Sequence, residues 1–253
     1  MAEIVIETKG LTRSFGSGRG VFDIDLQIPR GSIFGLLGRN GAGKTTLIKI
    51  LLGLLLEDRG EAFIEGLHFH RDNTEILQKI GYVDENRRLY NWMRVNEIIQ
   101  FNASFFPNWD SDYSSALIAE FNLPENEKIQ NLSRGENALV ALILALGHHP
   151  RILILDEATS GLDVLVRRKF LERLIDFSCK DNTTILFSSH LLDDLERVCD
   201  QIAIIEKGKL LLHGSMEDIK KQYCSMTASS PVSHSRLEDI FIQILEKPEL
   251  VQK

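Results

Sequence analysis

A glycine-rich segment that contains a lysine and a threonine carries the clearest chemistry in this sequence. Residues 38–46, GRNGAGKTT, fit the P-loop spacing G-x-x-x-x-G-K-[ST]. In such a loop the backbone N–H groups and the positive helix N-terminus face phosphates, the lysine adds a positive charge, and the next hydroxyl can bind Mg²⁺. We therefore expect a nucleotide to be bound by Gly38, Arg39, Asn40, Gly41, Ala42, Gly43, Lys44, Thr45 and Thr46.

Two carboxylates and a histidine follow apolar runs that predict buried strands. Asp156 and Glu157 follow residues 152–155, and His190 follows Ser188-Ser189 at the end of the run 184–187. Ligands bind at the carboxyl ends of parallel strands, so we expect all three beside the P-loop. Asp156 is predicted to bind Mg²⁺ with Thr45. Glu157, on the other side of an extended chain, is predicted to orient or deprotonate a water, and His190 to donate to the γ-phosphate or that water.

A second potential anion site lies further along the chain. Residues 132–136, LSRGE, precede the apolar helical run 138–147 and place a hydroxyl and a glycine at a helix N-terminus. One nucleotide cannot easily fill both sites in one chain, because Lys44 and its loop already surround it. Two chains that share nucleotides head to tail would solve this.

The elements that must position these residues alternate between strands and helices. Strands are predicted at 33–37, 152–155, 184–187 and 201–206, and helices at 45–56, 162–177 and 191–198. Before residue 36 the apolar alternation indicates antiparallel strands, and residues 86–149 are predicted to form a helical insert. The predicted fold is an α/β P-loop NTPase with a mainly parallel sheet, an N-terminal antiparallel β-subdomain and an inserted helical subdomain.

Five motifs in one order then identify a family resemblance that covers nearly the whole chain. The P-loop, LSRGE at 132–136, ILILDE at 152–157, SGLD at 160–163 and His190 together resemble the ATP-binding subunit of an ABC transporter. The resemblance implies that Phe15 stacks on adenine. It also implies that Ser133 and Gly135 hold the γ-phosphate of a partner's ATP, and that Asp163 couples the two sites.

Four residues depart from the family pattern. Glu85 stands where a glutamine usually reaches Mg²⁺ and senses the membrane partner; its carboxylate can still bind the metal but adds negative charge near the phosphates. Arg134 and Glu136 replace a glycine and a glutamine, and Ala158 replaces a proline. Lys44, Asp156, Glu157 and His190 are nevertheless all present, so hydrolysis of ATP to ADP and phosphate remains the expected activity.

The same motifs, together with local composition, predict the domain boundaries. Residues 1–224 are predicted to form the ABC-type ATP-binding domain, with the helical subdomain at 86–149. Residues 225–236, rich in Ser, Thr and Ala, are predicted to be a flexible linker, and residues 237–253 a C-terminal helix. This short domain with its LEDIF tail resembles subunits of ABC-2 type exporters.

Composition and charge bound the expected partners and location. The 36 acidic and 29 basic residues give a net charge of −7, which disfavours nucleic acid as a partner. No apolar run is long enough to span a bilayer, and the N-terminus lacks the pattern of a secretory signal. We expect a cytoplasmic protein, peripheral on the inner face of the cell membrane, that dimerises with an identical or similar ATPase chain around two Mg·ATP. Separate transmembrane permease subunits would contact the helical insert and the Glu85 loop.

Two alternatives stay open at this point. A soluble ABC ATPase acting on ribosomes or DNA usually carries two ATPase domains or a long coiled-coil insert, and this chain has one P-loop and neither feature. A regulatory subunit that binds nucleotide and hydrolyses it slowly would also fit the altered LSRGE segment. The steady-state ATPase rate separates the regulatory subunit from a motor.

Overall fold

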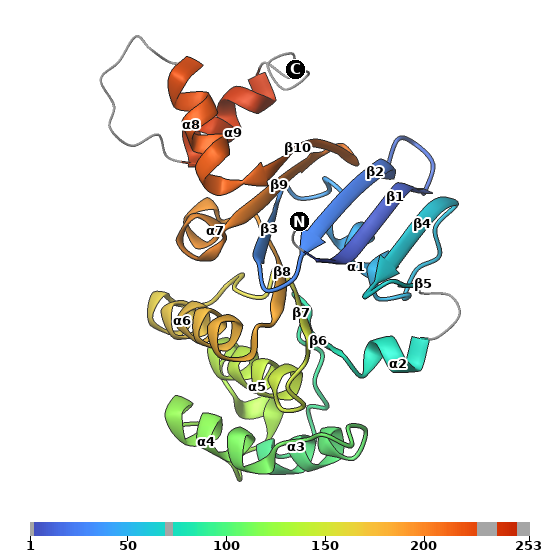
Figure 1. Ribbon diagram of the computed structural model, residues 1–253. Coiled ribbons are helices and arrows are strands. Elements are labelled where there is room, and N and C mark those ends of the chain that lie inside the picture. The colour runs from blue at the N-terminus through green and yellow to red at the C-terminus, as the bar shows by residue number, and fades with distance from the viewer. Residues whose placement is uncertain (1–2, 69–72, 227–236, 247–253) are drawn as a thin grey trace.

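The computed structural model describes residues 3–68, 73–226 and 237–246 (Figure 1). The N-terminal part of the chain forms an antiparallel sheet. Its strand order in the described residues is β2-β1-β4-β5, and every neighbouring pair is antiparallel. The strands are β1 (Ile4–Ser14), β2 (Gly20–Pro29), β4 (Arg59–Ile64) and β5 (Leu67–His68). The antiparallel strands predicted before residue 36 are therefore confirmed as β1 and β2, and β4 and β5 extend that sheet.

A second, mainly parallel sheet holds the strands that the buried apolar runs predict. Its order in the described residues is β10-β9-β3-β8-β7-β6, parallel throughout except for the β9–β10 hairpin. The strands are β3 (Ile33–Leu37), β6 (Ile80–Val83), β7 (Ile152–Asp156), β8 (Thr184–Ser189), β9 (Gln201–Glu206) and β10 (Lys209–Ser215). Strands β3, β7 and β8 are adjacent, so the P-loop, Asp156 and His190 leave the sheet at the same edge.

Both faces of the parallel sheet are covered, which explains why its strands are apolar without alternation. Ile152 and Ile154 pack in the core that contains α1 and the antiparallel sheet, whereas Leu153 and Leu155 pack in the core with α5 and α6. All four side chains are fully buried. The strand carrying Asp156 is thus held from both sides, which fixes the position of its carboxyl end.

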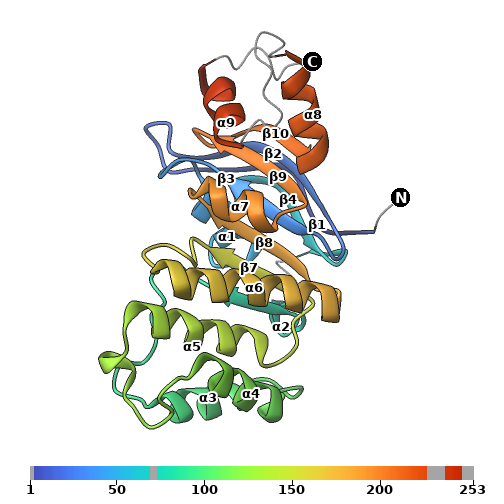
Figure 2. The same ribbon diagram turned by 90° about the vertical axis from the view of Figure 1, so that its left-hand side faces the viewer.

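Four of the helices, α3 to α6, form layers on one side of this sheet (Figure 2). Below the strands lie α6, then α5, then α3 and α4, while α8 and α9 lie at the opposite end. The described helices are α1 (Lys44–Leu51), α2 (Asn73–Leu77), α3 (Val95–Ala103), α4 (Ser111–Phe121), the 3₁₀ turn η1 (Ile129–Asn131), α5 (Arg134–Leu146), α6 (Val164–Asp181), α7 (Leu192–Val198), α8 (Met216–Met226) and α9 (Leu237–Glu246). Across the described residues, no helix combines the length and apolar character that a bilayer crossing requires.

Several helix boundaries differ from the sequence prediction, and α6 for example runs from Val164 to Asp181 instead of from 162 to 177. Helix α1 ends at Leu51 instead of continuing to residue 56, because Gly53 adopts a left-handed conformation with φ +61°. The N–H of Gly53 then bonds to the carbonyl of Ile50, and that of Leu54 to Lys49, the paired bonds of a Schellman motif. Helix α8 includes residues 225 and 226, which the sequence prediction assigns to the linker. The rest of that linker, 227–236, and residues 247–253 of the predicted C-terminal helix lie outside the described residues.

Candidate active site

The P-loop joins a fully buried strand to a helix whose N-terminus is open. Gly43 is the N-cap of α1 at φ +114°, and no side chain caps the helix. Gly41 also has a positive φ, +82°. At Gly38 a Cβ would lie 2.5 Å from the Ile205 carbonyl oxygen, so only glycine fits there. The loop therefore presents backbone N–H groups, with the positive end of the helix, to an anion.

Lys44 and Glu157 form a buried ion pair at the mouth of this loop. Lys44 Nζ lies 2.9 Å from Glu157 Oε1, and the two side chains are 5 % and 7 % exposed. The same ammonium donates a hydrogen bond of 2.6 Å to the Gly38 carbonyl. Glu157 is paired with the ammonium that a phosphate would also bind. An incoming anion therefore competes with this carboxylate for Lys44.

Glu157 reaches this position through an unusual backbone conformation. Its φ is +51°, so the residue is not part of an extended chain, and that element of the sequence prediction is wrong. Its N–H donates to the carbonyl of Ser188 at 3.1 Å and to the Ser188 hydroxyl at 3.2 Å, which anchors the turn. His190 Nδ1 lies 2.6 Å from Glu157 Oε2. The structure thus brings together Lys44, Glu157 and His190, as the sequence predicts.

Asp156 is oriented by a residue that the sequence reading did not assign. The Ser188 hydroxyl donates to Asp156 Oδ1 at 2.7 Å, and the two residues are register partners on β7 and β8. Both are buried. Burial, and then the negative charges of Asp156 and Asp84, raise the pKa of Tyr82 on the neighbouring strand. A polar residue ending the strand next to Asp156 was the available signal for Ser188.

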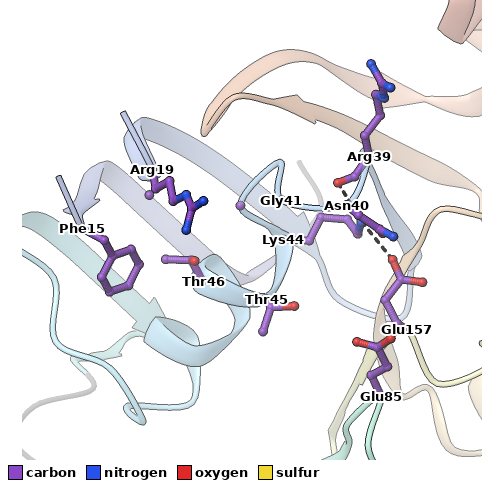
Figure 3. A pocket seen from close by; sticks show the side chains of 12 residues that line it. Phe15, Arg19, Arg39, Asn40, Gly41, Lys44, Thr45, Thr46, Glu85 and Glu157 are labelled. Carbon is purple, nitrogen blue, oxygen red and sulfur yellow. Dashed lines mark hydrogen bonds and ion pairs between the residues drawn. The ribbon is translucent and has the colours of Figure 1, made fainter. Parts of the chain in front are cut away.

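A cavity of about 470 Å³ lies at the P-loop, and Lys44 and Glu157 are among the residues that line it, whereas Asp156 is not (Figure 3). Phe15 and Arg19 lie at one side of the P-loop helix, and Glu85 and Glu157 lie at the other. Phe15 is 52 % exposed, and the Arg13 guanidinium lies 5.3 Å from its ring centroid. The lining residues are Phe15, Arg19, Gly20, Arg39, Asn40, Gly41, Gly43, Lys44, Thr45, Thr46, Glu85 and Glu157. Arg19 and Gly20 were missed, because nothing in the glycine-containing β1–β2 turn marks them.

A second cavity of about 520 Å³ continues from the first. It shares Arg39, Asn40 and Gly41 with it and adds Ala42 and His190. The predicted P-loop residues other than Gly38, together with His190, therefore line one or both of these adjoining cavities. An elongated ligand with an aromatic end near Phe15 and an anionic end near Lys44 matches this layout.

The second helix N-terminus lies elsewhere and has its own internal partners. The Ser133 hydroxyl accepts the Glu136 N–H at 3.2 Å, and Glu136 Oε2 accepts the Ser133 N–H at 2.8 Å, a capping box at the start of α5. Asp163 caps α6 in a similar way through the N–H groups of Leu165 and Val166. Within the described chain, Ser133, Gly135 and Asp163 do not line the cavity at the P-loop.

Glu85 stands between the two regions. It lines the cavity at the P-loop and also a polar cavity of about 540 Å³ that reaches Arg134 at the start of α5. The loop that carries Glu85 follows β6, the neighbour of β7 in the sheet. A displacement of this loop would therefore change the lining of both cavities.

Comparisons with known proteins agree with this geometry. The family model described as ABC transporter matches residues 21–160, more than half of the chain. The chain is 29 % identical to the ABC transporter ATP-binding protein YtrB of Bacillus subtilis, over 87 % of this chain and 75 % of that protein. It is 35 % identical to the bacitracin transport ATP-binding protein BcrA of Bacillus licheniformis, over 86 % of this chain and 72 % of BcrA.

Solved structures show the same fold. An ATP-binding subunit of an ABC transporter superposes with a TM-score of 0.84 at 26 % identity, over 95 % of this chain and 99 % of that one. A dimeric bacterial ABC transporter cassette superposes with a TM-score of 0.75 at 22 % identity, over 83 % of this chain and 98 % of that one, and shows the fold alone. This chain belongs to the ABC transporter family, as an ATP-binding subunit and an ATPase coupled to transport.

Proposed function

We propose that this chain binds Mg·ATP in the cavity at the P-loop and hydrolyses it to move a substrate through separate membrane subunits. The observation that carries the proposal is the meeting of Lys44, Glu157 and His190 at the mouth of an open helix N-terminus. The N–H groups of residues 38–46 and the Lys44 ammonium bind the β- and γ-phosphates. Adenine stacks on Phe15, whose exposed ring stands across the cavity from the carboxylates (Figure 3).

The metal site is proposed from the oxygen groups near the phosphates. Thr45, Asp156 and Glu85 supply hydroxyl and carboxylate oxygens, the donors that Mg²⁺ prefers. The hydrogen bond from Ser188 fixes the orientation of the Asp156 carboxylate, as a metal ligand requires. When bound, the metal neutralises negative charge on the β- and γ-phosphates.

Glu157 and His190 are proposed as the catalytic residues. When phosphates take the Lys44 ammonium, Glu157 loses its ion-pair partner and becomes free to accept a proton from the attacking water. The imidazole of His190 holds the other carboxylate oxygen at 2.6 Å, which keeps Glu157 aimed at the cavity. His190 then donates a hydrogen bond to the γ-phosphate or to that water.

The second helix N-terminus is proposed to act on the ATP of a partner chain. Ser133 and Gly135 lie away from the chain's own cavity, so a head-to-tail dimer of identical or similar ATPase chains would place them against the partner's γ-phosphate. Asp163 would couple the two sites across that dimer. The dimeric state of one cassette with the same fold supports this arrangement.

The membrane partner is proposed to dock on the helical insert, residues 86–149, beside the Glu85 loop. Four exposed aromatic rings form a continuous surface there, with successive centroid distances of 6.2, 5.7 and 5.1 Å. They are Trp92, Tyr90, Phe101 and Phe105, between 40 % and 65 % exposed. Such an apolar patch fits a helix of a permease subunit. We propose export as the direction, because the LEDIF segment at 237–241 resembles the tail of ABC-2 type exporter subunits, and the inner face of the cell membrane as the location.

The test uses Glu157→Gln in the full chain, tagged and purified with ATP and nuclease from detergent-solubilised native cells. We expect this variant to bind ATP, to hydrolyse it at least about a hundredfold more slowly, and to accumulate as a dimer. A polytopic membrane protein should co-purify. Unchanged turnover would remove Glu157 from its role, and ribosomal or DNA-associated proteins in place of a membrane protein would overturn the transporter coupling.

A further inference from the structure

Arg87, in the loop after β6, has a backbone that is held in place locally. Its φ is +45°, in the left-handed region, and its N–H donates to the Asp84 carboxylate three residues earlier. Its Nε donates to the carbonyl of Glu85 at 3.2 Å. The side chain therefore leaves the Glu85 loop in one fixed direction, and a change in that loop moves the guanidinium with it.

The guanidinium joins this loop to two segments that are distant in sequence. Arg87 Nη2 donates to the Ser160 carbonyl at 2.7 Å, and Nη1 lies 3.4 Å from the Arg134 carbonyl. Ser160 belongs to the turn that follows Glu157, since its N–H bonds to the Glu157 carbonyl at 3.0 Å. Arg134 is the first residue of α5. One side chain thus connects the Glu85 loop, the turn after Glu157 and the start of α5.

The chemistry of arginine suits this position. A planar guanidinium offers donors in several directions at once, whereas a lysine ammonium on its flexible stem acts as a single point charge. The Arg87 side chain is partly buried, and burial lowers its pKa, while the charges of Asp84 and Glu85 act in the opposite direction and that of Arg134 adds to the lowering. An arginine stays protonated under these conditions, so the hydrogen bonds are charge-assisted.

We propose that Arg87 is a positioning residue that carries displacement of the Glu85 loop to the turn after Glu157 and to the N-terminus of α5. Arg87 itself does not line the cavity at the P-loop, and its hydrogen bonds go to Asp84, Glu85, Arg134 and Ser160. Arg87 sets the positions of the Ser160 carbonyl and of the first turn of α5 when ATP is bound. This proposal rests on the proposed function, in which the Glu85 loop faces the membrane partner and α5 faces the second chain's ATP.

The test compares Arg87→Ala, Arg87→Lys and the matched control Arg88→Ala, because Arg88 is the exposed neighbour. Each full-length variant is measured for ATP affinity, for kcat and KM of ATP hydrolysis, and for the thermal unfolding midpoint. We expect Arg87→Ala to lower kcat on the order of tenfold with an ATP affinity within about twofold of the unaltered chain, because misplaced groups slow chemistry more than binding. Arg87→Lys should recover part of the lost kcat, and Arg88→Ala should change neither value.

A second readout does not depend on turnover. In the Glu157→Gln background, Arg87→Ala should bind ATP normally but form the ATP-dependent dimer on the order of tenfold more weakly than Arg88→Ala does. Equal kcat and equal dimerisation for Arg87→Ala and Arg88→Ala would overturn the positioning role and leave the proposed function standing. A parallel loss of ATP affinity and thermal midpoint would show a structural role instead, and would also overturn it. Absence of hydrolysis by the unaltered chain would overturn the proposed function itself.

Discussion

The N-termini of α1 and α5 are both predicted anion sites, yet the structure builds them in opposite ways. Helix α1 starts at Gly43 without a side-chain cap and with Lys44 beside it. Helix α5 starts inside a capping box in which Ser133 and Glu136 satisfy each other's N–H groups. The first N-terminus has donors ready for a ligand, whereas the second has already bound its own side chains.

The difference between the two helix N-termini indicates that a single chain can bind a phosphate at α1, whereas a phosphate at α5 requires a second chain. A phosphate meets backbone N–H groups and an ammonium at α1, where it competes with Glu157 and with the Gly38 carbonyl for Lys44. At α5 the Glu136 carboxylate occupies the positive end of the helix, a placement that stabilises the isolated chain. A partner's phosphate would meet that negative charge, so we expect ATP to bind at α1 first and the shared site to form afterwards.

The largest expected effect comes from removing the ammonium at α1. Lys44→Ala should weaken ATP binding about a hundredfold or more, because a buried charge-assisted contact to the phosphates is lost. Isothermal calorimetry with ATP and Mg²⁺ measures the change. Lys49→Ala is the matched control, since Lys49 is exposed in the last turn of the same helix.

Near-normal ATP affinity in Lys44→Ala would remove the contrast between the two helix ends. It would mean that backbone N–H groups alone hold the phosphates at α1. The variant also leaves the buried Glu157 carboxylate without its cation, so its thermal midpoint must be compared with that of Lys49→Ala.

The α1 site was largely predictable from sequence, because local spacing determines it. The P-loop motif gives the loop and the start of the helix, and the four aliphatic residues before Asp156 give the adjacent strand. What could not be predicted is the turn at Glu157. A positive φ in a glutamate depends on the bonds of its N–H to Ser188 on another strand, and the sequence carries no local signal for that.

The surroundings of α5 were less predictable for the same physical reason. The S-x-x-E spacing of Ser133 and Glu136 fits a capping box, whereas the LSRGE motif by itself predicts an open anion site. Arg87 was missed because its partners are backbone carbonyls, at Ser160 and Arg134, which any residue type supplies. Contacts to distant carbonyls leave no motif, so only the fold reveals them.

A smaller effect should follow from removing the negative charge at α5. Glu136→Gln keeps a side chain that can accept the Ser133 N–H but carries no charge against a partner's phosphate. In the Glu157→Gln background we expect the ATP-dependent dimer to tighten several-fold, up to about tenfold. Analytical ultracentrifugation over a range of protein concentrations measures the dissociation constant of the dimer.

Two results would show that Glu136 does not restrain the shared site. Weaker dimerisation in Glu136→Gln would mean that the carboxylate itself contributes to the contact between chains. An equal gain in Glu125→Gln, which neutralises an exposed carboxylate outside any helix, would mean that only net charge matters. The affinity of the single chain for ATP at α1 should be the same in both variants.

The smallest effect concerns the cap itself. Ser133→Ala removes the acceptor of the Glu136 N–H and should lower the free energy of unfolding by about 1 kcal/mol. Ser133→Thr keeps a hydroxyl and should lose less, as measured by urea denaturation of the chain without nucleotide. If Ser133 also contacts a partner's phosphate, Ser133→Ala should weaken the ATP-dependent dimer by more than Ser133→Thr does, while ATP binding to the single chain stays unchanged. A loss of stability with unaltered dimerisation would leave α5 with a cap and no anion site, and the contrast with α1 would then be complete.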